Sequence, residues 1–240
     1  MRLALDATDE TTDPHMAAEM YAALALQTAL RPAMWKRNPD RELVDGWIER
    51  ALELAPAETR ARAEALVARA FWHRPDSRAA EDAREGGAIA EKLNAVDVLS
   101  YAFSARALDA LASSDYARAE EATRRRLALL PEVSDPDHRA DVYWSALLVH
   151  AALGRLTEAG RSAQLNDEIN SLLTPHHRVH GIAARVRVDE LCGRWDAIRD
   201  LQKDAESRVA ANEDTPCSED RKSTRLNSSH SKQSRMPSSA

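Results

Sequence analysis

The chain has 240 residues, with 33 lysines and arginines against 39 aspartates and glutamates and a formal net charge of −6. An acidic balance lacks the positive field that nonspecific binding to nucleic acid or an anionic membrane surface requires, so we expect neither. The two cysteines, Cys192 and Cys217, are too few to form a disulfide framework. Residues 1–6 carry no signal-peptide pattern, and no apolar run is long enough to span a bilayer. These features favour a cytoplasmic location.

Residues 13–212 are expected to form helix after helix. Alanine, leucine, arginine and glutamate dominate there, glycine is scarce, and the alternation of β-branched residues that marks strands is nearly absent. Capping residues and helix breakers set the boundaries. In chain order the expected helices run over 13–30, 39–54, 56–72, from 76 onward with an interruption at Gly86 and Gly87, and then over 95–112, 115–130, 135–154, 157–173, 174–193 and 195–211.

Two groups of side chains are interpreted as structural. Arg124, Arg125 and Arg126 follow Glu120 and Glu121 at helical spacing, which favours a solvated helix face over a phosphate or nucleic-acid site. Most tryptophans stand among apolar residues and are expected to anchor the core rather than to stack on bases. The tryptophans are Trp35, Trp47, Trp72, Trp144 and Trp195.

A pattern recurs at three of the expected helix junctions. In each, a small residue closes one helix, a polar residue follows, then a large apolar residue, and three positions later a second apolar residue on the same helical face. The three copies are Ser114, Tyr116 and Ala119; Gly154, Leu156 and Ala159; and Gly193, Trp195 and Ile198. The large residues lie 40 and 39 positions apart, and a weaker junction at Pro75 and Asp76 precedes Tyr116 by the same spacing.

A fixed period near 40 with two helices per period predicts a helical solenoid, because one helix pair cannot bury its apolar face alone. We therefore expect an all-α fold, a right-handed α-solenoid of about five antiparallel helix pairs over 13–212. Residues 1–12 are expected to be irregular or disordered, and 213–219 to begin a continuation that is cut short.

The three junctions resemble those of tetratricopeptide repeats, in which glycine, a polar residue, an aromatic residue and then alanine occupy these positions. The period exceeds that family's usual length of about 34 residues, so the units are divergent. Residues 134–144 and 173–181 are similar to the C-terminal helical-repeat regions of large bacterial signalling proteins. This resemblance implies an ATPase module, and a nucleotide-cyclase or DNA-binding module, elsewhere in the same protein.

Residues 220–240 resemble translated sequencing adapter. Residues 220–230 and 234–240 each fit one reading frame of a common short-read library adapter, and the residues between them leave room for an index. We expect this segment to be a disordered artefact. On this interpretation the chain is a truncated fragment of a longer protein.

The sequence favours a non-catalytic, cofactor-free role in protein–protein interaction or regulation, because it contains no phosphate-binding loop, nucleophile elbow or paired cysteines. If the first helix of each pair lines an inner groove, four side chains are candidates to bind a protein or peptide partner. They are Tyr101, Trp144, His180 and Arg187. Burial between repeats is the other interpretation of these four.

Two alternatives stay open. The first is a standalone helical adaptor. The second is a metal- or small-ligand-binding helical protein that uses His176, His177 and His180, since positions 176 and 180 share a helix face at metal-ligand spacing and Cys192 is close in sequence. The cluster lies in the first turn after Thr174 and Pro175, and no His-Glu-x-x-His pattern is present, so a structural or surface role is favoured.

Overall fold

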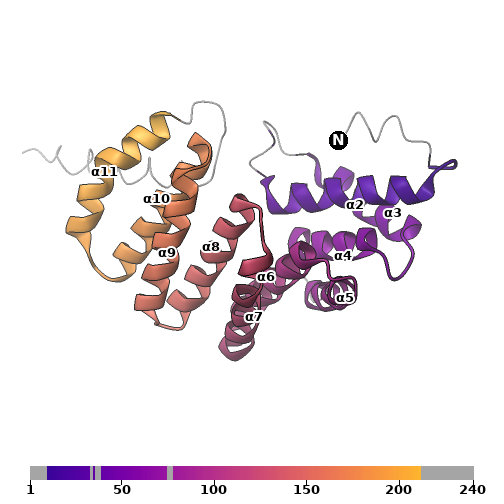
Figure 1. Cartoon of the computed structure of the whole chain (residues 1–240), viewed down its shortest axis with the longest axis horizontal. Coiled ribbons are helices and arrows are strands. Elements are labelled where there is room, and N and C mark those ends of the chain that lie inside the picture. Colours follow the sequence, from indigo (N-terminus) through magenta and orange to yellow (C-terminus); the bar gives the residue numbers. More distant parts are fainter. Residues whose placement is uncertain (1–9, 33–34, 36–38, 75–77, 212–240) are drawn as a thin grey trace, which may run out of the picture.

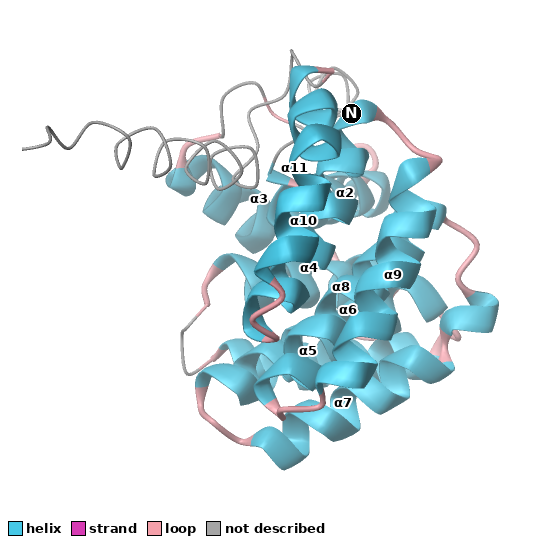
Figure 2. Ribbon diagram, turned by 90° about the vertical axis from the view of Figure 1, so that its left-hand side faces the viewer, coloured by secondary structure: helices cyan, strands magenta, loops and turns pink. Residues whose placement is uncertain are grey.

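A computed structural model describes residues 10–32, 35, 39–74 and 78–211. Within these ranges the chain forms ten α-helices and one short 3-10 helix, and no β-strand (Figure 2). The α-helices are α2 (Pro14–Leu30), α3 (Arg41–Leu54), α4 (Arg60–Trp72), α5 (Ala79–Lys92), α6 (Val96–Ala112), α7 (Tyr116–Ala128), α8 (Pro136–Ala152), α9 (Leu156–Ser171), α10 (Pro175–Leu191) and α11 (Trp195–Ala210). The 3-10 helix η2 (Leu130–Glu132) follows α7. The all-α prediction is confirmed.

From α6 to α11 the helices follow one another in chain order along the longest axis of the molecule, and α2–α5 gather at its other end (Figure 1). Each helix packs on its neighbours in sequence, and α2, α4, α6, α8 and α10 also contact one another in that order. We call these five helices the even layer. Helices α3, α5, α7, α9 and α11 pack mainly on their sequence neighbours. This packing of backbones is that of a helical solenoid, in which each unit packs mainly on adjacent units.

Capping residues account for the observed helix starts. The side chains of Asp13 and Asp115 accept hydrogen bonds from backbone N–H groups three residues later, at 2.9 and 3.1 Å. Helix α4 begins at Arg60 rather than at Pro56, because Thr59 takes the capping position and accepts from the N–H of the third residue that follows it.

The turns that end α5, α6, α8 and α10 share one backbone geometry. Asn94, Ser114, Gly154 and Gly193 have φ angles of 53°, 58°, 71° and 68°. The N–H of the residue after each donates to the carbonyl five positions earlier, at 2.7–2.9 Å, and this pair of features defines a Schellman turn. The three predicted junctions are therefore real turns. The sequence pattern misses the fourth, at Asn94, because it lies between helix pairs rather than within one.

Gly86 and Gly87 do not interrupt α5, which runs through both. The prediction of a break is wrong because these residues serve packing rather than a turn. A Cβ atom at Gly86 would lie 3.0 Å from the carbonyl oxygen of Ala63, so glycine lets α5 cross α4 closely. Gly181 in α10 has the same role, since a Cβ there would lie 2.9 Å from the Cα of Asp167 in α9.

Four segments for which the sequence made predictions lie outside the described ranges. These segments are residues 1–9, the junction at Pro75 and Asp76, the continuation at 213–219, and the adapter-like segment 220–240. Residues 10–12 form a turn before α2. None of the described helices combines the length and the apolar character that crossing a bilayer would need.

Candidate interaction surface

The four predicted groove residues lie in three helices of the even layer, in different surroundings. Tyr101 in α6 is 6% exposed and stacks on His138 in α8, with ring centroids 4.0 Å apart. Trp144 in α8 is part-buried against the apolar cluster between α8, α9 and α10. His180 is part-buried and Arg187 exposed, both in α10. A separation of seven residues is close to two helical turns, so His180 and Arg187 share one face of α10.

A buried polar network lies beside Tyr101, with Arg126 of α7 at its centre. Arg126 is 1% exposed. Its Nε donates to Ser100 Oγ at 3.2 Å, and its Nη1 donates to Ser104 Oγ at 3.0 Å and to Ser145 Oγ. Its Nη2 forms an ion pair with Asp141. The network joins α6, α7 and α8 through one guanidinium group.

The expectation of a solvated arginine face is therefore wrong for Arg126. Arg124 is exposed and pairs with Glu121 on its own helix, as expected. Arg126 instead follows the buried Ala119 and Ala122 at helical spacing, which turns its side chain toward α6 and α8. This spacing is the sequence signal that would have identified Arg126 as buried.

His138 belongs to the same network. Its Nε2 lies 2.9 Å from Ser100 Oγ, and its ring is buried beneath Tyr101. Burial, together with the positive charge of Arg126, lowers the pKa of His138 to about 4. Burial also raises the pKa of Tyr101. Both groups are therefore neutral near pH 7, as their stacked and buried positions require.

Three side chains, Arg31, Asp137 and His177, form a contact that we call the Asp137 bridge. Arg31, at the C-terminal end of α2, places its Nε 2.7 Å from Asp137 Oδ2 in α8. His177 Nε2 in α10 lies 3.0 Å from Asp137 Oδ1. The hydrogen bond from His177 and the charge of Arg31 lower the pKa of Asp137. One carboxylate thus links three helices of the even layer that are far apart in the chain.

The histidine cluster occupies the first turns of α10. The Nε2 atoms of His176 and His180 are 3.1 Å apart, and their ring centroids are 4.7 Å apart. His177 meets His176 edge to face, at a centroid distance of 5.6 Å. Cys192 follows the opposite end of α10 and does not join the cluster. In the described ranges, no set of three or more histidine, cysteine or acidic side chains is arranged to hold a metal.

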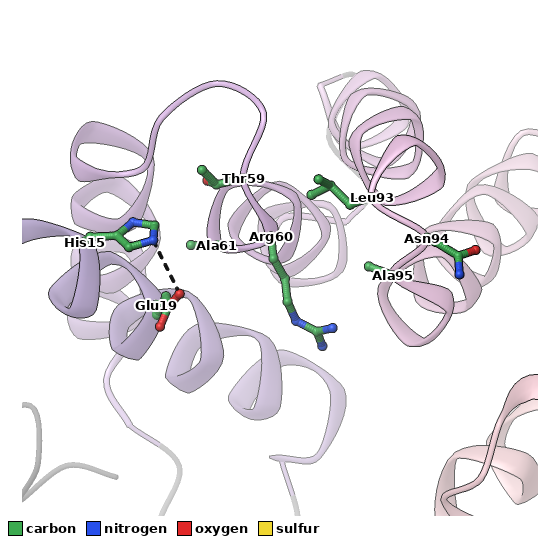
Figure 3. Close-up of a pocket in the computed structure, with 8 residues that line it drawn as sticks. All are labelled: His15, Glu19, Thr59, Arg60, Ala61, Leu93, Asn94 and Ala95. Carbon is green, nitrogen blue, oxygen red and sulfur yellow. Dashed lines mark ion pairs between the residues drawn. The ribbon is translucent and has the colours of Figure 1, made fainter.

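A shallow pocket of about 350 Å³ lies at the start of α4 (Figure 3). His15 and Glu19 of α2 line one side and the turn at Leu93, Asn94 and Ala95 lines the other, with Thr59, Arg60 and Ala61 between them. Arg60 pairs with Glu64 at 2.8 Å and with Asp97, and His15 pairs with Glu19 at 3.7 Å. The pocket's charges are thus already matched within the protein, so we assign it no ligand.

Trp195 is not a core anchor, contrary to its prediction. It is 56% exposed at the start of α11, whereas Trp47 is buried and Trp35, Trp72 and Trp144 pack, part-buried, on apolar clusters. The reason is its position in the last described helix. Helix α11 packs on one neighbouring helix, α10, with an ion pair from Arg208 to Asp167 of α9 in addition, and none of its residues is buried. The equivalent helix α9 lies between α8 and α10 and buries Ala159 completely.

No protein family, no curated protein and no solved structure matches the chain. What the protein does is therefore inferred from its own helices and side chains.

Proposed function

We propose that the chain is a non-catalytic helical-repeat segment that binds a protein partner and acts through that contact. The observation that carries this proposal is the even layer, whose helices contact one another in chain order instead of surrounding one closed core. Such an array exposes a long continuous surface in proportion to its size. Helical-repeat proteins use surfaces of this kind to bind partners.

The face of α10 that carries His180 and Arg187 is the part of this surface that we assign to the partner. Arg187 is exposed, and within the described part of the chain no carboxylate pairs with it. Its neighbours Arg185 and Arg194 are paired with Asp167 and Asp189. Arginine is among the residues that dominate binding energy at interfaces, and its charge favours a peptide or helix with acidic side chains.

Charge reversal tests this surface. The full chain, carrying Arg187→Glu, is compared with the wild type in cross-linking capture from source cells, and the captured partner is then purified for titration. We expect Arg187→Glu to weaken binding at least tenfold. The matched control is Arg161→Glu, an exposed arginine of α9, which should change the affinity less than twofold. Equal binding of all three proteins would contradict the assignment of this face.

The regulatory context is proposed from the resemblance of residues 134–144 and 173–181 to repeats of bacterial signalling proteins. In that context the segment is cytoplasmic and transmits a signal to ATPase and cyclase or DNA-binding modules outside this chain. Long-read sequencing of the source locus tests it. An ATPase module in the same reading frame would support this context, and a natural stop codon after the codon for Ala240 would support a standalone adaptor instead.

A further inference from the structure

We propose that His176 and His180 form a two-histidine site for a divalent transition-metal ion at the start of α10. The site goes beyond the protein-binding function proposed above and shares His180 with the face assigned to the partner, but its test does not depend on that function. It stands on the relative positions of the two imidazole rings, which are fixed on one helix four residues apart.

The ring positions match those of two imidazoles that share one ion. Zinc binds histidine nitrogen at about 2.0–2.1 Å. With bonds of about 2.1 Å at the tetrahedral angle, two nitrogens that share one zinc ion lie about 3.4 Å apart. The observed separations are 3.1 Å between the Nε2 atoms and 4.7 Å between the ring centroids. The nitrogens are thus within about 0.3 Å of the separation that one shared ion requires, which a small side-chain rotation supplies.

The two rings meet through a hydrogen-bond contact between their Nε2 atoms, which lie 3.1 Å apart, with the ring centroids 4.7 Å apart. The same two nitrogens therefore face each other, and an ion that binds both takes the place of the proton between them.

The surroundings hold this turn in place. Pro175 occupies the first position of α10, and Val179, between the two histidines, is fully buried. His177 is engaged elsewhere, because its Nε2 contacts Asp137 and its Nδ1 lies 2.7 Å from Thr174 Oγ1. A fixed backbone reduces the ordering that binding an ion would otherwise require.

The donor set indicates which ions bind. Imidazole nitrogen suits Zn²⁺, Ni²⁺ and Cu²⁺, whereas Mg²⁺ and Ca²⁺ prefer oxygen ligands. Two protein nitrogens leave the remaining coordination positions to water or to a group from a partner. The site is therefore an exchangeable one, unlike the closed four-ligand sites that structural zinc uses.

Titration of the metal-free full chain with Zn²⁺ tests the proposal. We expect one Zn²⁺ per chain, and at least tenfold weaker binding after His176→Ala with His180→Ala. Two controls should retain binding within about threefold: His177→Ala, whose ring faces Asp137, and His230→Ala, which lies outside the described residues. Mg²⁺ should give no binding.

A second measurement on the unaltered protein covers the case in which the double variant fails to fold. Bound Cu²⁺ should give an electron paramagnetic resonance spectrum with two nitrogen ligands. Undiminished Zn²⁺ binding by a folded double variant, no binding by the wild type, loss of binding in His230→Ala, or a copper spectrum without two nitrogens would each overturn the site.

Discussion

The helices α2–α6 and α7–α11 are held together in different ways. One large apolar cluster joins the first group and includes Leu24, Trp47, Ile48, Leu66 and Val67. The second group lacks a cluster of that size among its described residues and has only smaller, alanine-rich ones, of a kind that the first group also contains. Between its helices lie buried polar side chains such as Arg126, Asn166 and Asn170.

The polar contacts of the second group are directional. Asn166 Nδ2 donates to the carbonyl of Ala140 at 2.7 Å, and Asn170 Nδ2 donates to Asn166 Oδ1 at 2.9 Å. Apolar burial stabilises without specifying direction, whereas buried hydrogen bonds penalise any displacement that breaks them. We infer that the first group provides most of the stability, and that the second is fixed chiefly by the geometry of its contacts.

The largest effect is expected at Arg126. Arg126→Ala removes a fully buried side chain and leaves Ser100, Ser104 and Ser145 without its hydrogen bonds. The cavity, the lost hydrogen bonds and the lost ion pair with Asp141 should lower the free energy of unfolding by about 4 kcal/mol. Urea titration measures this. Arg124→Ala, on the exposed face, should change it by less than about 0.5 kcal/mol. A loss below about 1 kcal/mol at Arg126 would remove the contrast between the two groups.

The next effect concerns pH. The pKa of His138 is about 4 in the folded protein, against roughly 6.5 for an unfolded histidine. Between these values the unfolded chain binds a proton that the folded chain does not, so stability falls as pH decreases from about 6.5 to about 4. The loss is roughly 1.4 kcal/mol per pKa unit, up to about 3 kcal/mol.

The measurement is urea unfolding at pH 7 and pH 4.5 for the wild type and His138→Phe. Phenylalanine keeps a ring against Tyr101 but cannot be protonated. The free energy of unfolding should change less between pH 7 and pH 4.5 in the variant than in the wild type, by about 2 kcal/mol. The same pH dependence in both proteins would mean that His138 does not carry it.

A smaller effect is expected where α9 and α10 cross. Gly181→Ala would force a Cβ to 2.9 Å from the Cα of Asp167, so the two helices must separate. We expect a loss of about 2 kcal/mol in the free energy of unfolding. Gly46 in α3 has nothing within 4 Å of such a Cβ, and Gly46→Ala should stabilise by about 0.5–1 kcal/mol through helix propensity. Equal effects at both glycines would show that α9 and α10 adjust freely.

The smallest expected effect is a gain at Ser114. Its φ of 58° lies in the left-handed region, which costs serine but not glycine. Ser114→Gly should therefore raise the free energy of unfolding by about 0.5–1 kcal/mol. The reverse exchange at the equivalent turn, Gly154→Ser, should lower it by a similar amount. Thermal unfolding of both variants measures the pair, and shifts of the same sign would contradict a shared turn geometry.

The parts of the fold that were predictable depend on local sequence. Pro136 and Pro175 mark helix starts, and Gly154 and Gly193 mark helix ends, because a cap or a left-handed turn is decided within a few residues. The spacing of Arg126 from Ala119 and Ala122 indicates its burial, but its partners were not predictable, because the serines lie 19 to 26 positions away on other helices.

The features of the candidate sites also divide into those that local sequence determines and those that depend on contacts between distant segments. The spacing of His176 and His180 is readable in the sequence, but the contact between their rings depends on the packing of α10. The Asp137 bridge could not be predicted at all, because no periodicity relates Arg31 to a carboxylate more than a hundred residues later. Long-range polar contacts are decided by the assembled fold, not by the segments that contribute them.

The Asp137 bridge also gives the array an elastic property. An array in which each helix contacts only its neighbours extends elastically when its ends are pulled apart. Arg31, Asp137 and His177 connect α2, α8 and α10 directly. We therefore expect these ion pairs to resist extension, like a tie, before the helices between them slide past one another. Because these side chains are only part-buried, salt weakens the tie. The stiffness of the array under tension should therefore fall with ionic strength, while its helices stay intact.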